Sequence, residues 1–106
     1  FTFVSDTVAA NLLAAEAPGS VCGRAYNIAA GGRVTVNDIA ESIRKAVGSS
    51  AVPRYEAPRA GDVKHSLADP SRARESLGFI ARVSLDEGIA KTAEHFGVPV
   101  RHGARA

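Results

Sequence analysis

One segment of the sequence carries every signal of a complete α-helix, and similar signals recur along the chain. In TVNDIAESIRKAVG, Thr35 is a natural N-cap, Asp38 follows three residues later, and Gly48 ends the pattern. Apolar residues recur between these ends at helical spacing: Val36, Ile39, Ala40, Ile43 and Val47. This segment predicts a short, well-capped helix, and a fold assembled from several short elements and turns.

Three more segments are predicted to be helices. The first, near the start of the sequence, has Ser5 or Asp6 as a candidate cap and stops at the tripeptide APG. The second begins with Asp69 as N-cap and Pro70 at the first helical position, where the missing N–H costs nothing. The third, residues 84–97, opens with a Ser-x-x-Glu capping box and closes with glycine.

Two segments between these helices are predicted to be short β-strands. Arg24–Ala29 contains Tyr26 and Ile28 as an alternating apolar pair. Ala51–Pro58 contains Pro53, which favours an edge strand or the start of a strand. Helices and strands then alternate along the chain, which is typical of an α/β fold with helices packed on short strands.

The composition is that of an ordinary soluble globular protein, and 106 residues are enough for one domain. The 13 Lys and Arg residues barely outnumber the 11 Asp and Glu residues, and the arginines are interleaved with acids. We therefore expect no nucleic-acid partner. The first residues are apolar only in short runs, so we expect no secretory signal, no membrane partner and a cytoplasmic location.

Generic catalytic and metal-binding patterns are not found. The single cysteine, Cys22, excludes an internal disulfide and a cysteine cluster for a metal. His65, Ser66 and Asp69 lie close together in sequence, without the nucleophile elbow of serine hydrolases. The segment AAGGR lacks both the G-x-G-x-x-G spacing and the ending of a P-loop, so it is predicted to be a plain turn. We expect no catalytic residue and no bound metal.

One loop contains side chains suited to binding a nucleotide. In APRAGDVKHSLAD, Arg59 offers a guanidinium that can hold phosphate oxygens with two hydrogen bonds, and Asp62 can accept hydrogen bonds from two ribose hydroxyls. Gly61 permits a sharp turn that lets both side chains face one ligand. The spacing alone favours a simpler alternative, in which Arg59 and Asp62 form an ion pair across the turn.

Four stretches resemble, in order and spacing, the C-terminal part of the NAD-dependent nucleotide-sugar epimerases and dehydratases. These enzymes are extended short-chain dehydrogenases/reductases of the UDP-glucose 4-epimerase type. The stretches are FTFVSDTVAANLLAAE, AYNIAAGGRVTVNDIAESIRKAVG, PRAGDVKHSLADPSRARESLGF and VSLDEGIAKTAEHF. Together they extend from Phe1 to about Phe96, and R-x-G-D followed by SLAD is their most specific feature.

The resemblance implies a substrate-binding lobe over residues 1–97 and a loose tail over residues 98–106. In the family, the arginine of R-x-G-D contacts the nucleotide diphosphate and the aspartate contacts the ribose. These roles fall on Arg59 and Asp62, which places ligand binding ahead of the ion pair. Asp6 matches a family aspartate at the start of a helix, where we expect it to act as a helix cap.

The family's catalytic and cofactor-binding parts have no counterpart in the sequence. Neither Tyr26 nor Tyr55 has a lysine four residues later, and no glycine-rich turn offers a site for the pyrophosphate of NAD. We therefore expect a truncated portion of a UDP-sugar epimerase or dehydratase, without the Rossmann half. Such a portion binds no NAD and is not catalytically competent alone.

Two alternatives remain open. In one, the chain is a stand-alone interaction or oligomerisation module that has lost ligand binding. In the other, it is half of an enzyme and needs a separate NAD-binding subunit. An apolar surface that would meet the nucleotide domain is expected to be exposed, so we predict a homo-oligomer that associates through this surface and binds a UDP-sugar weakly or not at all.

Overall fold

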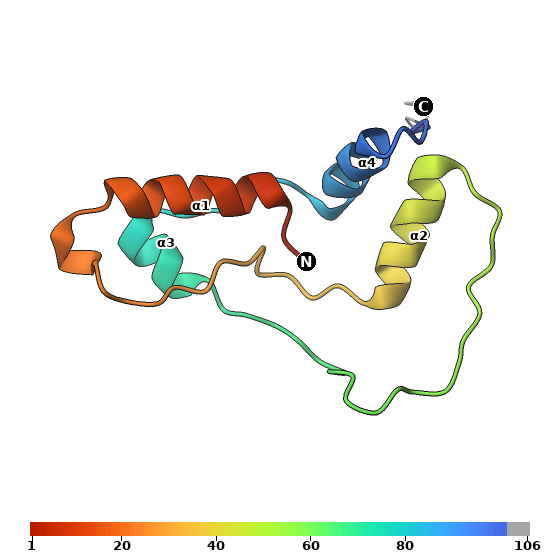
Figure 1. Ribbon diagram of the computed structural model, residues 1–106, viewed down its shortest axis with the longest axis horizontal. Helices are drawn as coiled ribbons and strands as arrows, with labels where there is room; N and C mark the ends of the chain where they lie inside the picture. Colours follow the sequence, from red (N-terminus) through yellow and green to blue (C-terminus); the bar gives the residue numbers. More distant parts are fainter. Residues whose placement is uncertain (102–106) are drawn as a thin grey trace. The chain divides into compact units, whose positions relative to one another are not determined.

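The four predicted helices are all present in the computed structural model, which describes residues 1–101 (Figure 1). They are listed here in chain order: α1 spans Val4–Glu16, α2 Val36–Val47, α3 Ser71–Leu77 and α4 Leu85–His95. A short 3₁₀-helix, η1, spans Gly19–Val21 just after α1. None of the helices in this part of the chain is long and apolar enough to cross a bilayer.

The two predicted strands are absent from the described residues, so this prediction is wrong. Arg24–Ala29 and Ala51–Pro58 are irregular, and no residue from 1 to 101 belongs to a β-strand. A strand forms when its N–H and C=O groups pair with a second extended backbone. Within residues 1–101, no backbone hydrogen bond joins either segment to another. Residues 1–101 therefore form a helical fold instead of the predicted α/β fold.

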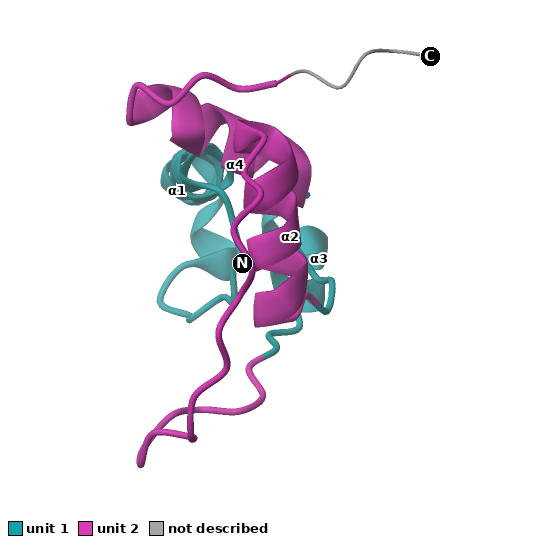
Figure 2. Cartoon of the chain, turned by 90° about the vertical axis from the view of Figure 1, so that its right-hand side faces the viewer, with its two compact units in different colours: residues 1–33, 67–84 teal, residues 34–66, 85–106 magenta. Residues whose placement is uncertain are grey.

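The chain folds as two compact units, and each unit combines two separate stretches of sequence (Figure 2). The first unit contains Phe1–Arg33 and Leu67–Ser84, with α1, η1 and α3. The second unit contains Val34–Ser66 and the residues from Leu85 onward, with α2 and α4.

The core of the first unit is small and lies where α1 packs against α3. Its fully buried hydrophobic residues are Ala10, Ala73 and Phe79. Gly78 ends α3 with a φ of 68°, a left-handed conformation that glycine adopts without strain, and the next residue is the buried Phe79. Four partly buried residues pack around this core: Leu13, Tyr26, Ile28 and Ala81.

Asp6 lies in the first turn of α1 but is not its N-cap, so that prediction is wrong. The N-cap position is Phe3, which makes no side-chain capping bond. The Asp6 side chain is buried, and its two oxygens accept hydrogen bonds from the backbone N–H groups of Arg82 and Val83, each at 3.1 Å. Asp6 therefore links α1 to the segment that follows α3.

The capping box predicted for α2 in the second unit is confirmed. The Asp38 N–H donates to the Thr35 hydroxyl at 3.1 Å, and the Thr35 N–H donates to the Asp38 carboxylate at 2.8 Å. At the other end, Gly48 has a φ of 66°, and its N–H donates to the carbonyl oxygens of Arg44 and Lys45. Both ends of α2 were therefore predicted correctly.

The second unit has very little core of its own. α2 packs against α4, and across this contact the buried hydroxyl of Ser42 donates a hydrogen bond to the Asp86 carboxylate. The fully buried hydrophobic residues of the described chain all lie in the first unit. The apolar side chains of Val36 and Ile43 on α2 are exposed. The α2 and α4 pair is thus held mainly by partly buried contacts and one polar bridge.

The predicted loose tail, residues 98–106, is only partly covered by the structure. Residues 102–106 lie outside the described residues. Within the described part, the Arg101 N–H donates to the carbonyl oxygen of Ala46 at 2.7 Å, near the end of α2. A loose tail, like the division into a 1–97 lobe and a tail, stays a prediction.

Candidate functional site

The segment that carries the predicted ligand-binding residues is a long irregular loop in the second unit. We define the arm as residues 49–66, which follow the end of α2 and contain R-x-G-D (Figure 1). Every residue of the arm is exposed. The arm therefore presents its side chains to solvent, where a ligand can reach them.

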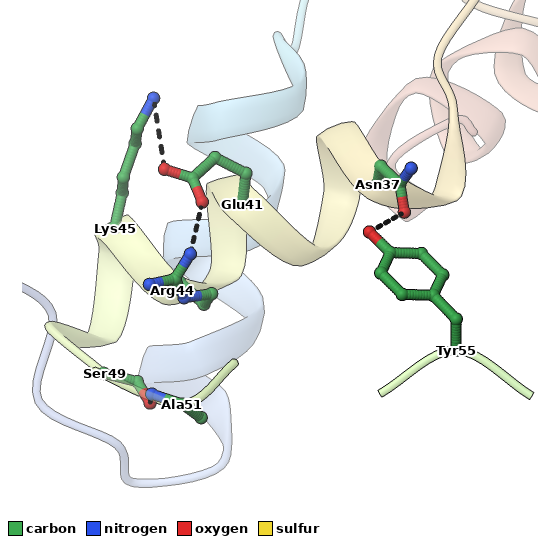
Figure 3. Close-up of polar contacts among 7 residues, drawn as sticks. All are labelled: Asn37, Glu41, Arg44, Lys45, Ser49, Ala51 and Tyr55. Carbon is green, nitrogen blue, oxygen red and sulfur yellow. Dashed lines mark hydrogen bonds and ion pairs between the residues drawn. The ribbon is translucent and has the colours of Figure 1, made fainter. Parts of the chain in front are cut away.

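The first half of the arm is held near α2 by a contact that sequence reasoning missed. The Tyr55 hydroxyl donates to the side-chain oxygen of Asn37 at 3.3 Å (Figure 3). Arg54 and Glu56 on either side of Tyr55 form an ion pair at 2.5 Å. Alternate residues share one side of an extended chain, so this ion pair indicates an extended backbone around Tyr55.

The sharp turn predicted at Gly61 is present. The Asp62 N–H donates to the carbonyl oxygen of Arg59 at 3.3 Å, which closes a four-residue turn. Gly61, the third residue of this turn, has a φ of 88°. A type II turn requires a positive φ at that position and favours glycine there. The glycine between Arg59 and Asp62 therefore sets the backbone that carries both side chains.

The ion pair that the spacing alone favoured is not formed. None of the ion pairs among residues 1–101 joins Arg59 to Asp62. Both residues are exposed. A guanidinium with five N–H donors and an acceptor-only carboxylate thus lie three positions apart with their hydrogen-bonding groups open to a ligand.

The predicted N-cap of α3 is wrong by one position, because Pro70 and not Asp69 is the N-cap, although the Asp69 side chain does accept hydrogen bonds at the start of the helix. The Asp69 carboxylate accepts hydrogen bonds from the Ser71 N–H at 2.9 Å and from the Ser71 hydroxyl at 2.5 Å, and α3 begins at Ser71. These two bonds, together with the positive charge of Arg74, hold the pKa of Asp69 below its usual value of 3.8. The Asp69 carboxylate thus accepts its hydrogen bonds from the first residue of α3. This argues against a catalytic grouping of His65, Ser66 and Asp69.

The glycine-bearing turn before α2 does not fit the pyrophosphate of NAD. Hydrogen bonds from the hydroxyl and the N–H of Thr35 hold the pKa of Asp38 below 3.8, so its carboxylate is ionised at neutral pH. This negative charge occupies the helix N-terminus, where a dinucleotide site needs free N–H groups for a phosphate. The part of the chain that the structure describes also contains no cluster of His, Cys, Asp or Glu suited to a metal ion.

No family model matches the chain, but individual proteins do. The UDP-glucose 4-epimerase of Mycolicibacterium smegmatis is 38% identical over 96 residues, which cover 91% of this chain and 30% of that protein. The chain corresponds to a C-terminal part of an NAD-dependent epimerase. The human UDP-glucose 4-epimerase is 32% identical over 87 residues, and these cover 81% of this chain and 25% of the human enzyme.

A solved structure extends the similarity from sequence to fold. The crystal structure of UDP-glucose 4-epimerase with UDP-glucose from Thermotoga maritima matches with a TM-score of 0.82 and 38% identity. The match covers 91% of this chain and 30% of the Thermotoga epimerase. This chain therefore spans less than a third of the length of these epimerase relatives.

Proposed function

We propose that this chain is the portion of a nucleotide-sugar epimerase or dehydratase that contacts the nucleotide of a UDP-sugar. Arg59 would hold the diphosphate and Asp62 the ribose. The observation that carries the proposal is the exposed R-x-G-D turn, in which Arg59 and Asp62 do not pair with each other. The similarity to UDP-glucose 4-epimerases, one of them solved with UDP-glucose, supports the choice of ligand.

The chemistry of the turn suits a diphosphate better than a neutral ligand. A guanidinium can donate two parallel hydrogen bonds to phosphate oxygens, and such charge-assisted bonds are about twice as strong as neutral ones. The turn offers only two side chains in an exposed position, however, and water competes for both. We expect a dissociation constant of about 1 mM, because two exposed charged contacts contribute little free energy.

The chain alone would not catalyse the reaction. When bound, NAD would supply reversible hydride transfer, but the helix N-terminus tested above does not fit it, and no tyrosine of the sequence is followed by a lysine at the family spacing. Mixing the chain with NAD and UDP-glucose should yield no UDP-galactose and no absorbance from NADH. Product formed in proportion to the purified chain would contradict this part of the proposal.

The two segments predicted as strands would become strands only beside further backbone from a longer epimerase. Ala51–Pro58 is locally extended around Tyr55, and Arg24–Ala29 already contributes Tyr26 and Ile28 to packing in the first unit. Their backbone groups make no ladder within residues 1–101. These two segments therefore have sequences suited to strands but lack a second backbone with which to form hydrogen bonds.

A titration of UDP into the isotope-labelled chain, followed by NMR, tests the nucleotide contact. We expect saturable shifts of the amide signals in the arm, lost in Arg59→Ala. Arg54→Ala is the matched control, because Arg54 is an exposed arginine of the same arm that pairs with Glu56. Uridine should bind more weakly than UDP if the diphosphate supplies the main contact. Equal shifts in both variants, or none with millimolar UDP, would contradict the proposal.

The exposure of many large apolar side chains favours a second candidate, an interaction module. In this case the chain would associate through those side chains and would not bind UDP. This alternative would be established if the chain self-associates and the amide signals of its arm do not shift when UDP is added. A half-enzyme that needs an NAD-binding subunit would instead bind UDP and gain activity only when that subunit is added.

A further inference from the structure

Apart from Arg59 and Asp62, residues 57–63 around the R-x-G-D turn have no side chain that can form a hydrogen bond. A nucleoside diphosphate consists of a diphosphate, a ribose and a base, and the two charged side chains suit the first two parts. The other residues of this stretch have no side-chain donor or acceptor: Ala57, Pro58, Ala60, Gly61 and Val63. The turn therefore offers side-chain contacts to the diphosphate and the ribose, and none that recognises a base.

A protein needs such contacts to distinguish one base from another. Uracil, cytosine, guanine and adenine differ in the arrangement of donors and acceptors on their edges, and proteins recognise these edges by hydrogen bonds. A site built to hydrogen-bond a particular group strongly rejects an analogue that lacks it, whereas apolar surroundings discriminate little. The apolar residues beside Arg59 and Asp62 therefore give no preference for one base.

The backbone of the arm is equally unsuited to selecting a base. Each residue other than proline offers both an N–H donor and a C=O acceptor, so a backbone selects a base edge only when its direction is fixed. The bond from the Asp62 N–H to the Arg59 carbonyl oxygen is the one backbone-to-backbone hydrogen bond that residues 57–66 make within the described chain. Every residue of this stretch is exposed. Its other backbone groups are therefore hydrated, and they can meet either kind of base edge.

Two side chains on either side of this stretch could also touch a nucleotide, but neither depends on the base. The Tyr55 ring is 74% exposed, and its hydroxyl donates to Asn37 (Figure 3). An aromatic ring stacks on any base, because every base has a π-face. Lys64 is exposed, and its positive charge attracts the phosphates of every nucleotide alike. Both side chains would raise affinity without selecting a base.

We propose that this chain is a base-tolerant site for ribonucleoside diphosphates, whose affinity depends on the diphosphate and the ribose and not on the base. This inference rests on the proposed function, because it takes Arg59 and Asp62 as the nucleotide contacts. It widens the ligand class from UDP to all nucleoside diphosphates. It also narrows that class, because the acceptor-only carboxylate of Asp62 favours a ribose with both hydroxyls over a deoxyribose.

Titrations of UDP, CDP, GDP and ADP into the isotope-labelled chain, followed by NMR, test the tolerance for the base. A chelator keeps the nucleotides free of divalent cations, which would otherwise bind the same phosphate oxygens as Arg59. We expect four dissociation constants of about 1 mM that agree within about fivefold, the most that one exposed polar contact contributes. The same amide signals of the arm should shift with all four nucleotides, and Arg59→Ala should weaken all four alike.

Replacing UDP with 2′-deoxy-UDP tests the contact to the ribose. The deoxynucleotide should bind the wild-type chain about two- to fivefold more weakly, because it lacks one of the hydroxyls that donate to Asp62. Asp62→Ala should bind the two ligands equally, since the acceptor is gone. Glu56→Ala is the matched control, because it removes an exposed carboxylate from the same arm, and it should keep the preference for UDP. The comparison of two ligands on one variant is insensitive to a general change in the arm.

The outcomes separate this inference from the proposed function. A dissociation constant for UDP more than about fivefold below that for GDP would overturn the tolerance for the base. Equal binding of UDP and 2′-deoxy-UDP by the wild-type chain would overturn the requirement for ribose. If UDP alone binds, and Arg59→Ala abolishes its binding, the proposed function stands and the base tolerance is wrong. If none of the four nucleotides binds, both proposals are wrong.

Discussion

The Asp6 carboxylate on α1 accepts a hydrogen bond from the backbone N–H of Arg82, 76 positions later in the chain. Its second oxygen accepts from the next N–H, that of Val83. Because Asp6 is buried, these two bonds replace the hydrogen bonds to water that its two oxygens and the two N–H groups would otherwise make. The start of α1 is thus fixed to the segment after α3 by one side chain, next to a hydrophobic core of only three fully buried residues.

Replacing Asp6 with alanine should destabilise the first unit by about 2–3 kcal/mol, because it leaves two N–H groups without their charged acceptor. Urea unfolding followed by circular dichroism measures this loss. Hydrogen exchange adds a local measurement, in which the amides of Arg82 and Val83 should exchange faster in Asp6→Ala. Asp6→Asn keeps one acceptor oxygen and should have an intermediate effect.

Glu16→Gln provides the control for these Asp6 variants. It removes a carboxylate from an exposed position of the same helix, and surface changes of this kind usually alter the free energy of unfolding by less than about 0.5 kcal/mol. If Asp6→Ala and Glu16→Gln are equally stable, or if the Arg82 and Val83 amides keep their exchange rates, the Asp6 link does not stabilise the unit.

The Ser42 hydroxyl and the Asp86 carboxylate should be energetically coupled. They form the polar bridge between α2 and α4 in a unit that has little hydrophobic core. A double-mutant cycle with Ser42→Ala and Asp86→Ala should give a coupling free energy of about 1 kcal/mol, since one charge-assisted bond is removed. Additive effects of the two substitutions would show that the bridge contributes nothing.

The sequence was sufficient to predict the helices because their signals are local. The Thr35 and Asp38 box, the hydrogen bonds that Asp69 accepts at the start of α3 and the glycines that follow α2 and α3 all act within a few residues. The sharp turn at Gly61 is local in the same way. These features depend on backbone conformation and short-range hydrogen bonds, so they form whatever surrounds them.

The features that were predicted wrongly, or not predicted at all, depend on partners far away in the sequence. A strand at Ala51–Pro58 requires a second extended backbone to pair with. No other segment of residues 1–101 forms backbone hydrogen bonds with it. The role of Asp6 depends on Arg82 and Val83, and a helix cap was the reasonable local interpretation. For the candidate site, Arg59 and Asp62 are predicted from the motif and stay a prediction, whereas the bond from Tyr55 to Asn37 has no sequence signal.

The capping box gives a prediction about pH. The bonds from Thr35 lower the pKa of Asp38 in the folded chain below 3.8. A lowered pKa in the folded state means that the ionised carboxylate stabilises α2 fully above its unfolded pKa, and that this contribution disappears as the pH falls through the lowered value. The helicity of α2 should therefore decrease at pH values below about 4.

Thr35→Val tests this origin of the Asp38 shift. Removing the hydroxyl should raise the pKa of Asp38 toward 3.8, as measured by NMR titration of its carboxyl carbon. Thr7→Val serves as the control, because Thr7 lies on α1 in the other unit. An unchanged Asp38 pKa in Thr35→Val would mean that another group lowers it.

Gly61→Ala should weaken UDP binding without lowering the thermal stability of the chain. A Cβ at this position would meet no neighbouring atom within 4 Å, so the effect arises from the backbone alone. The φ of 88° is unfavourable for alanine by roughly 1–2 kcal/mol, and an exposed turn relieves this strain by changing its conformation. The change would move Arg59 relative to Asp62 and should reduce the affinity for UDP by about tenfold. Gly19→Ala, at an open position without a positive φ, should bind UDP normally. An unaltered affinity in Gly61→Ala would show that the turn does not position the nucleotide contacts.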